Sequence, residues 1–169
     1  MIDTITTGYY INSGTIYTSE ETLGHDALIY CSSDNNCGVV EAKVNNIYID
    51  SGNTGNIITC DSTTCTSIKG SSLPGHAYIN AHDTTKRTIF TCSNGICSNK
   101  DMELSSSNIY FIDGFDNTKI IYCNSNDGCS SNAKPSTESV NVSYVDGLDN
   151  TRIITCTVSG CISSNGNYI

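Results

Sequence analysis

The sequence contains no Trp and few positively charged residues: 8 Lys and Arg stand against 17 Asp and Glu, for a net charge of −9. A chain this acidic is repelled by phosphate backbones and by anionic lipid headgroups, so we expect it not to bind nucleic acid. It also lacks a continuous apolar run long enough to span a bilayer. Residues 1–7 have neither the basic start nor the apolar stretch of a signal peptide, so we interpret the chain as a fragment of a larger secreted or cell-surface protein.

Strong helix formers are scarce, whereas Ser, Thr, Asn and Gly together approach half of the chain. Most of the remaining apolar residues are Ile, Val and Tyr, which favour a pleated, half-buried surface over a helix. The composition therefore predicts an all-β protein.

The cysteines show that the chain is repetitive. There are ten, in five close pairs, and the first members of successive pairs are 29, 32, 31 and 33 residues apart. The pairs are Cys31/Cys37, Cys60/Cys65, Cys92/Cys97, Cys123/Cys129 and Cys156/Cys161. A fixed period of this length is the sequence signature of a repeat protein.

Two further motifs recur with the cysteines. A short apolar run ends at each first cysteine, as in Ile57-Ile58-Thr59-Cys60, and upstream of it an aromatic residue is followed by Ile or Val and then Asn or Asp, as in Tyr48-Ile49-Asp50. We therefore expect a single repeat array over residues 1–169. Its units lie at about 8–45, 46–75, 76–107, 108–138 and 139–165, with the start of a further unit at 166–169.

Each unit contains two strand-like runs joined by a connection rich in Gly, Asn, Asp and Ser, which predicts a β-hairpin followed by a turn. One hairpin has too few apolar side chains to bury a core of its own, so neighbouring units must share one. The predicted fold is an array of disulfide-stapled β repeats, each of about 31 residues, stacked into an elongated β-solenoid-like structure.

The spacing of five or six residues lets each cysteine pair close a disulfide within its own unit. Zinc binding is the alternative, but zinc requires four ligands and five pairs do not divide into fours. No Cys-x-x-Cys redox motif occurs. Each short disulfide loop contributes about 2 kcal/mol on the chain-entropy model. The pattern favours structural disulfides formed in an oxidising, extracellular compartment, and no metal or cofactor is expected.

In-register stacking would align the acidic residues into two columns. The first contains Asn12, Asp50, Asn80, Asp113 and Asp146, and the second contains Asp116 and Asp149. Such columns could hold catalytic carboxylates or calcium, but Asn or Asp directly after a strand is most often a turn cap. His25, His76 and His82 form no recognisable catalytic set with the other side chains, so we expect the protein not to be an enzyme.

The aromatic residues form another column, which includes Tyr10, Tyr48, Tyr78, Phe111 and Tyr144. Tyr offers a large contact area together with a hydroxyl group, so this column could serve in recognition. The alternative is that these side chains fill the core shared by neighbouring units. Both interpretations are open from the sequence.

The tandem pattern resembles the cysteine-rich cohesin-type repeats of the scaffoldins of anaerobic gut fungi. The motifs that carry this resemblance are Gly8-Tyr9-Tyr10-Ile11-Asn12, Leu28-Ile29-Tyr30-Cys31 and a second cysteine six residues on, repeated along essentially the whole chain. The resemblance implies a non-catalytic scaffoldin segment that binds the dockerin domains of cellulases and hemicellulases in a fungal cellulosome. The alternative function is an extracellular carbohydrate-binding or polysaccharide-degrading β-solenoid.

We predict that a partner protein binds exposed Tyr and Asp side chains where the two motifs coincide. The predicted partner-binding residues are Tyr48, Asp50, Asp113, Asp116, Asp146 and Asp149. If these do not bind, the insertion of the first unit, residues 14–26, is the next candidate, because insertions in repeat proteins gather on one face. Asn141 begins the sequence Asn-Val-Ser and is a glycosylation candidate.

Overall fold

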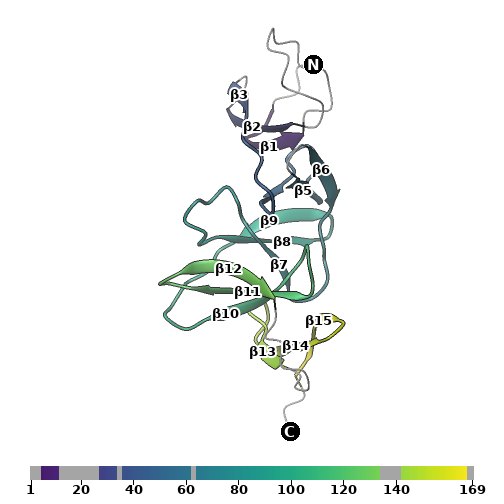
Figure 1. Cartoon of the computed structure of the whole chain (residues 1–169), viewed down its shortest axis with the longest axis vertical. Helices are drawn as coiled ribbons and strands as arrows, with labels where there is room; N and C mark the ends of the chain where they lie inside the picture. The colour runs from purple at the N-terminus through teal and green to yellow at the C-terminus, as the bar shows by residue number, and fades with distance from the viewer. Residues whose placement is uncertain (1–4, 12–26, 34–35, 62–63, 134–141, 167–169) are drawn as a thin grey trace. The chain divides into compact units, whose positions relative to one another are not determined.

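The computed structural model describes residues 5–11, 27–33, 36–61, 64–133 and 142–166. In these ranges the chain forms β-strands and no helix, which confirms the all-β class (Figure 1). Consequently, the described residues contain no helix that could cross a membrane. Asn12, residues 14–26, His25, Asn141 and residues 167–169 lie outside the described ranges.

Each repeat is a three-stranded antiparallel sheet. The strands are β1 (Gly8–Ile11), β2 (Leu28–Ser33) and β3 (Asn36–Val39) in the first repeat; β4 (Ile47–Ile49), β5 (Asn56–Cys60) and β6 (Cys65–Lys69) in the second; β7 (His76–Ile79), β8 (Ile89–Ser93) and β9 (Ile96–Lys100) in the third; β10 (Ile109–Asp113), β11 (Lys119–Asn124) and β12 (Gly128–Ala133) in the fourth; and β13 (Val142–Val145), β14 (Arg152–Thr157) and β15 (Gly160–Asn165) in the fifth.

The third strand of each repeat is not apparent in the sequence, which predicts only a hairpin. This strand begins at or near the second cysteine, and its residues include many Ser and Asn and few of the β-branched and aromatic residues that favour strands. Its register comes from the cysteines, because Cys60 pairs directly with Cys65, and Cys123 with Cys129. The expectation of two strands per unit is therefore wrong, whereas the repeat itself is confirmed.

The chain divides into two compact units, residues 1–69 with 94–97, and residues 70–93 with 98–169. In the second unit, β7 and β10 pair in parallel, which joins the third and fourth repeats into one six-stranded sheet. The first unit contains an equivalent parallel bridge between Tyr9 and Asp50. A solenoid-like stack of all five repeats stays a prediction.

The middle strand of the fourth repeat is buried on both of its faces. In β11, Ile121 packs with Phe111 against Ile89 of the preceding repeat, in one core cluster. The adjacent residue Ile120 packs against Ile154 of the following repeat, in a second core cluster. Successive strand residues point to opposite faces, so two adjacent Ile residues serve two interfaces. This explains why the apolar runs are continuous rather than alternating.

The fourth repeat therefore has two faces, and the corresponding faces of the other repeats take the same names. Its disulfide face meets the third repeat and carries the aromatic residue, the second Ile of the run and both cysteines, namely Phe111, Ile121, Cys123 and Cys129. Its forward face meets the fifth repeat and carries the residues that alternate with these. In the fourth repeat, Ile112 and Ile120 are its buried members.

Backbone hydrogen bonds connect neighbouring repeats at one recurring position. The residue after the Asp of the first column donates its N–H to the carbonyl of the residue before the aromatic in the preceding repeat. The bonds run from Ser51 to Tyr9, from Gly114 to Ala77 and from Gly147 to Tyr110, at 2.8–2.9 Å. Glycine is required at position 147, since a Cβ there would lie 2.5 Å from Cγ2 of Ile109 and 2.7 Å from Cε1 of Phe111.

Candidate functional surface

The first acidic column caps turns inside the protein. Asp50, Asp113 and Asp146 are buried. One carboxylate oxygen of each accepts a hydrogen bond from the backbone N–H two residues on, at 2.8 Å for Gly52 and Leu148 and 2.9 Å for Phe115. These Asx turns reverse the chain between the first and second strands of the repeat.

The other carboxylate oxygen of each Asp binds the third strand. Ser67 donates to Oδ2 of Asp50 at 2.5 Å, Ser131 donates to Oδ2 of Asp113, and Ser163 donates to Oδ2 of Asp146 at 2.5 Å. In the third repeat Asn80 replaces the Asp and bonds to Asn99 instead. Each partner stands two residues after the second cysteine, so the pattern Cys-x-Ser or Cys-x-Asn is the sequence signal for this contact.

These contacts correct the expectation that the first column is an exposed recognition surface. Asp50, Asp113 and Asp146 point inward, with both oxygens bonded to their own repeat. Burial of a carboxylate is tolerated here because several hydrogen bonds replace its water. The interpretation as a turn cap, which the sequence already favoured, describes the observed geometry.

The aromatic column is also buried at Tyr48, the member that we expected to bind a partner. Tyr48 is 4 % exposed, and its ring centroid lies 4.3 Å from that of Tyr9 in the preceding repeat. Burial, followed by the neighbouring Tyr48 and Tyr30 hydroxyls, raises the pKa of Tyr9 to about 12. Tyr110 and Tyr144 form an equivalent pair at 4.4 Å, and burial raises the pKa of Tyr144. Tyr48 is therefore a core residue, and its expected exposure is wrong.

The second acidic column, by contrast, is on the surface. Asp149 is exposed and Asp116 is partly exposed, and each accepts hydrogen bonds from the backbone N–H and hydroxyl of the Thr two residues later, Thr118 and Thr151. The Thr hydroxyl is the main cause that lowers the pKa of both carboxyls. Asp116 also forms an ion pair with Lys119 at 3.5 Å.

Asp83 is a third member of this surface row that sequence reasoning missed. It bonds to Thr85 in the same way and also accepts from the Thr88 hydroxyl, so the pKa of its carboxyl falls to about 2. The signal was present as Asp83-Thr84-Thr85, which matches Asp116-Asn117-Thr118. Two extra residues in the third repeat obscure the alignment.

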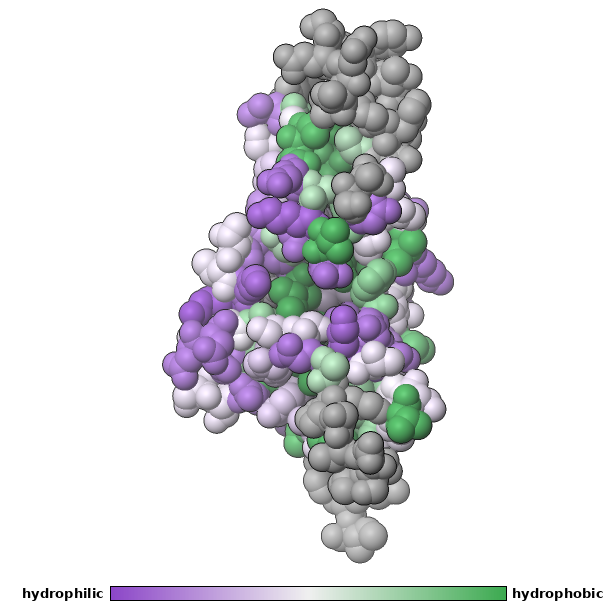
Figure 2. All heavy atoms as spheres, viewed as in Figure 1, coloured by the Kyte–Doolittle hydropathy of each residue, from purple (hydrophilic) through white to green (hydrophobic). Residues whose placement is uncertain are grey.

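Phe115 is a second surface residue that the sequence did not identify. It directly precedes Asp116, and its side chain is 51 % exposed. The Asx turn of Asp113 fixes this segment, because the N–H groups of Phe115 and Asp116 both donate to Asp113 Oδ1. On the face that Figure 2 shows, hydrophobic side chains form separate patches among hydrophilic ones. Phe115 and Asp116 thus place an aromatic ring and a carboxylate side by side on one rigid turn.

The predicted disulfides are confirmed. Bridges join Cys31 to Cys37, Cys60 to Cys65, Cys123 to Cys129 and Cys156 to Cys161, and Cys92 and Cys97 are also disulfide-bonded. They indicate an oxidising setting for the chain. Among the described residues, no group of three or more His, Cys, Asp or Glu side chains is arranged to hold a metal ion.

Of the histidines, His76 is buried in β7. Its Nδ1 lies 2.8 Å from Ser71 Oγ, and burial lowers its pKa although Asp113 and Asp146 act in the opposite direction. His76 is thus a core residue that hydrogen-bonds the preceding loop. His82 lies in the turn of the third repeat, where its backbone N–H donates a hydrogen bond to Oδ1 of Asn80.

Comparisons of this chain with models of known protein families, with curated proteins and with solved structures found no match. The surface described above therefore has to be interpreted from its own chemistry. It consists of exposed turns with similar side chains, repeated at equivalent positions of the third, fourth and fifth repeats.

Proposed function

We propose that this chain is a non-catalytic segment of a secreted scaffold protein that binds dockerin domains of plant-cell-wall-degrading enzymes, as in a fungal cellulosome. The tandem cysteine-paired pattern is the basis for the family. The structural observation that supports a scaffold is the repeated turn: Asp83, Asp116 and Asp149 present the same Thr-bonded carboxylate in three consecutive repeats. A surface that recurs along an array suits the binding of several similar partners.

We place the partner-binding surface at Phe115, Asp116 and Asp149. Aromatic side chains with partial exposure supply much of the binding energy at protein interfaces. The hydrogen bonds from Thr118 and Thr151 hold the two carboxylates in one orientation, so little side-chain entropy is lost on binding. Asp113 and Asp146 act indirectly in this proposal, because their Asx turns position the residues that follow them.

The charge of the protein defines the kind of partner surface. The chain has a net charge of −9, and the residues of the proposed surface are two carboxylates and one aromatic ring. A basic dockerin surface with an apolar pocket would be complementary to it. Electrostatic attraction of this kind speeds association and weakens as salt is added.

The test is the affinity of the full chain for a dockerin-bearing cellulase, measured by calorimetry. We expect the variant with Phe115→Ala, Asp116→Ala and Asp149→Ala to bind more weakly by about 2 kcal/mol or more, the scale of interface hot spots. The matched control carries Asp101→Ala, Glu103→Ala and Val158→Ala, which remove the same charge and one exposed apolar side chain elsewhere. The control should bind like the unmodified chain.

Failure of the unmodified chain to bind any dockerin-bearing enzyme would refute the proposal. The competing function, an extracellular carbohydrate-binding or polysaccharide-degrading β-solenoid, predicts that the chain is depleted from solution by insoluble cellulose. Depletion by cellulose in the absence of dockerin binding would favour that function.

A further inference from the structure

Two pairs of tyrosines meet across junctions between repeats, with nearly the same geometry. Tyr9 of the first repeat and Tyr48 of the second have ring centroids 4.3 Å apart and an interplanar angle of 37°. Tyr110 of the fourth repeat and Tyr144 of the fifth have centroids 4.4 Å apart and an angle of 32°. At these distances the two rings of each pair are in van der Waals contact.

The backbone positions both pairs in the same way. Tyr9 forms a parallel bridge with Asp50, and Tyr110 forms one with Asp146. The carbonyl of each tyrosine also accepts a hydrogen bond from the N–H of the residue after that Asp, at 2.9 Å and 2.8 Å. The second tyrosine of each pair stands two residues before the Asp, so this backbone contact sets the spacing of the two rings.

The hydroxyl groups of each pair also lie near each other. Burial is the first cause that raises the pKa of Tyr9 to about 12, and the Tyr48 hydroxyl is the second. Burial and then the Tyr110 hydroxyl raise the pKa of Tyr144. One hydroxyl affects the ionisation of another only at short range, so the rings lie with hydroxyl beside hydroxyl. The ring carbons next to each hydroxyl, Cε1 and Cε2, are therefore near those of the partner ring.

The disulfides do not connect the repeats that these tyrosines join. Each bridge, such as that between Cys31 and Cys37, links two strands of one repeat, whereas packing and backbone hydrogen bonds hold neighbouring repeats together. Tyr9 and Tyr110 are partly exposed, so a reagent in solution reaches one ring of each pair. The disulfides also indicate an oxidising setting. A bond between the tyrosine rings would join one repeat covalently to the next.

We propose that Tyr9 with Tyr48, and Tyr110 with Tyr144, are sites of oxidative dityrosine cross-linking, with hydrogen peroxide and a haem peroxidase as the oxidant. Each phenol loses one electron and its hydroxyl proton, and the two phenoxyl radicals combine to form a Cε–Cε bond. The hydrogen on each bonded carbon leaves as a proton while the phenol oxygen gains one, which restores both aromatic rings. The peroxide O–O bond breaks, and the two electrons and two protons taken from the phenols yield two waters.

The modification goes beyond the proposed dockerin binding and does not depend on it, because Phe115, Asp116 and Asp149 belong to neither pair. A link between residues 9 and 48 closes a much longer loop than the disulfides do, whose cysteines are five or six residues apart. It therefore removes more entropy from the unfolded chain. The cross-linked chain should melt at a temperature roughly five to ten degrees higher.

The junction between the third and fourth repeats is an internal negative control. Ala77 and Phe111 take the positions of Tyr9 and Tyr48 there. Tyr78 in turn stacks on a phenylalanine, Phe90, with ring centroids 5.0 Å apart. Neither Ala nor Phe forms a phenoxyl radical, so this junction should not cross-link.

The experiment treats the dilute full chain with hydrogen peroxide and a haem peroxidase, and isolates the molecules that remain monomeric on a denaturing gel. Dityrosine fluorescence measures the yield, and mass mapping after reduction and trypsin digestion identifies the linked residues. Trypsin cleaves after Lys43 and Lys119, which separates the two members of each pair. We expect two linked pairs of peptides, each lighter by two hydrogen atoms than the sum of its members.

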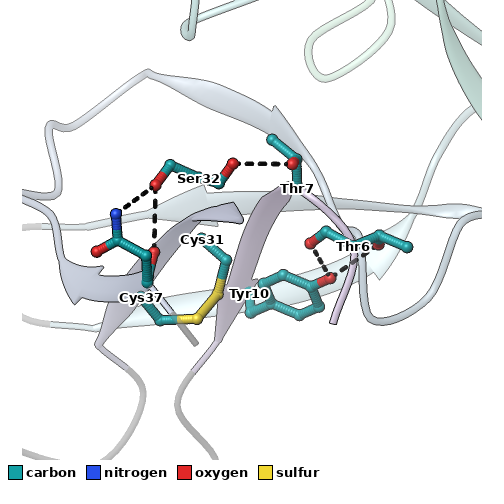
Figure 3. The surroundings of a disulfide bond; sticks show 7 residues. Thr6, Thr7, Tyr10, Cys31, Ser32 and Cys37 are labelled. Atoms are coloured by element: carbon teal, nitrogen blue, oxygen red, sulfur yellow. Dashed lines mark hydrogen bonds between the residues drawn. A yellow bond between two sulfur atoms is a disulfide. The ribbon is translucent and has the colours of Figure 1, made fainter. Parts of the chain in front are cut away.

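Phenylalanine variants test the assignment, because they keep the rings and remove the hydroxyls. Tyr48→Phe with Tyr144→Phe should lose both linked pairs and the rise in melting temperature. The matched control is Tyr10→Phe. Tyr10 follows Tyr9 on β1 but points to the opposite face, where its hydroxyl donates to the Thr6 carbonyl at 2.7 Å (Figure 3). This control should cross-link like the unmodified chain.

Circular dichroism checks that the double variant folds, and Tyr144→Phe alone, which should lose only its own pair, replaces it if it does not. Three results would each overturn the proposal. They are a chain without dityrosine after treatment, links confined to other tyrosines or to contacts between molecules, and linked pairs that persist in the phenylalanine variants.

Discussion

The Ser163 hydroxyl donates a 2.5 Å hydrogen bond to Oδ2 of Asp146, a carboxylate that is 1 % exposed. Ser163 also accepts a hydrogen bond from Nε of Arg152, and the other Asp146 oxygen accepts the N–H of Leu148. Gly75, which directly precedes β7, covers this group closely, since a Cβ on it would lie 2.9 Å from Asp146 Oδ2. The pair therefore connects a turn, an edge strand and a second repeat.

Replacing Asp146 should destabilise the fold strongly. Asp146→Ala removes the acceptor of two buried donors, the Leu148 N–H and the Ser163 hydroxyl. We therefore expect the free energy of unfolding to fall by about 2 to 4 kcal/mol. Chemical denaturation measures this change. Asp149→Ala, three residues on, is the control, and it should cost less than about 1 kcal/mol because that carboxylate is exposed. Equal effects of the two variants would contradict the buried cap.

A methyl group at Gly147 should weaken the junction between the fourth and fifth repeats. In Gly147→Ala the new Cβ would meet Ile109, the Phe111 ring and the Tyr110 carbonyl oxygen, all within 2.8 Å. Overpacking of this kind costs about 1 to 3 kcal/mol. Gly38→Ala is the matched control, because a Cβ there meets no atom within 4 Å. Thermal melting of both variants gives the comparison, and an unchanged melting temperature for Gly147→Ala would show that the junction is loosely packed.

Acid should remove part of the stability through Asp83. Its folded pKa is about 2, below its ordinary value of 3.8, chiefly because the Thr85 hydroxyl hydrogen-bonds the ionised form. A depressed carboxyl pKa stabilises the fold above the unfolded pKa, and this stability is lost as the pH falls through the folded pKa. We expect the melting temperature of the Asp83→Asn variant to fall less steeply than that of the unmodified chain between about pH 5 and pH 2. The effect should be small, because the carboxylate is partly exposed and water screens its contacts.

A direct readout of the same group is its carboxyl NMR titration. A midpoint close to the ordinary value of 3.8 would show that the Thr85 and Thr88 contacts do not persist in solution.

The disulfides should be reduced in a defined order. Cys37 is exposed, whereas Cys123, Cys129, Cys156 and Cys161 are buried. A thiolate must reach a sulfur atom to exchange with it, so mild reductant should release Cys31 and Cys37 first. Timed alkylation followed by peptide mass mapping measures the order. Complete reduction should lower the melting temperature by well over ten degrees, because each closed loop contributes about 2 kcal/mol. Release of Cys123 and Cys129 before Cys31 would contradict the observed burial.

The sequence by itself determined the all-β class, the repeat period and the disulfide pairing within repeats. These properties are local. A pair such as Cys60 and Cys65 is too close in the chain to span far, and the Ile-rich runs have a strong strand preference. The Asx caps were also readable, because an Asp such as Asp113 bonds a backbone N–H only two residues away.

Only the tertiary structure decided which members of each column face water. Asp113 and Asp116 are three residues apart and chemically identical, but Asp113 is buried because Ser131 from the third strand and the neighbouring repeat enclose it. Likewise, Tyr48 became a core residue since Tyr9 of the preceding repeat packs on its ring. Exposure depends on long-range neighbours, and a local motif does not encode where another repeat will pack. The period of the sequence therefore predicted which residues occupy equivalent positions in the repeats. The packing between neighbouring repeats decided which of these residues are exposed to solvent.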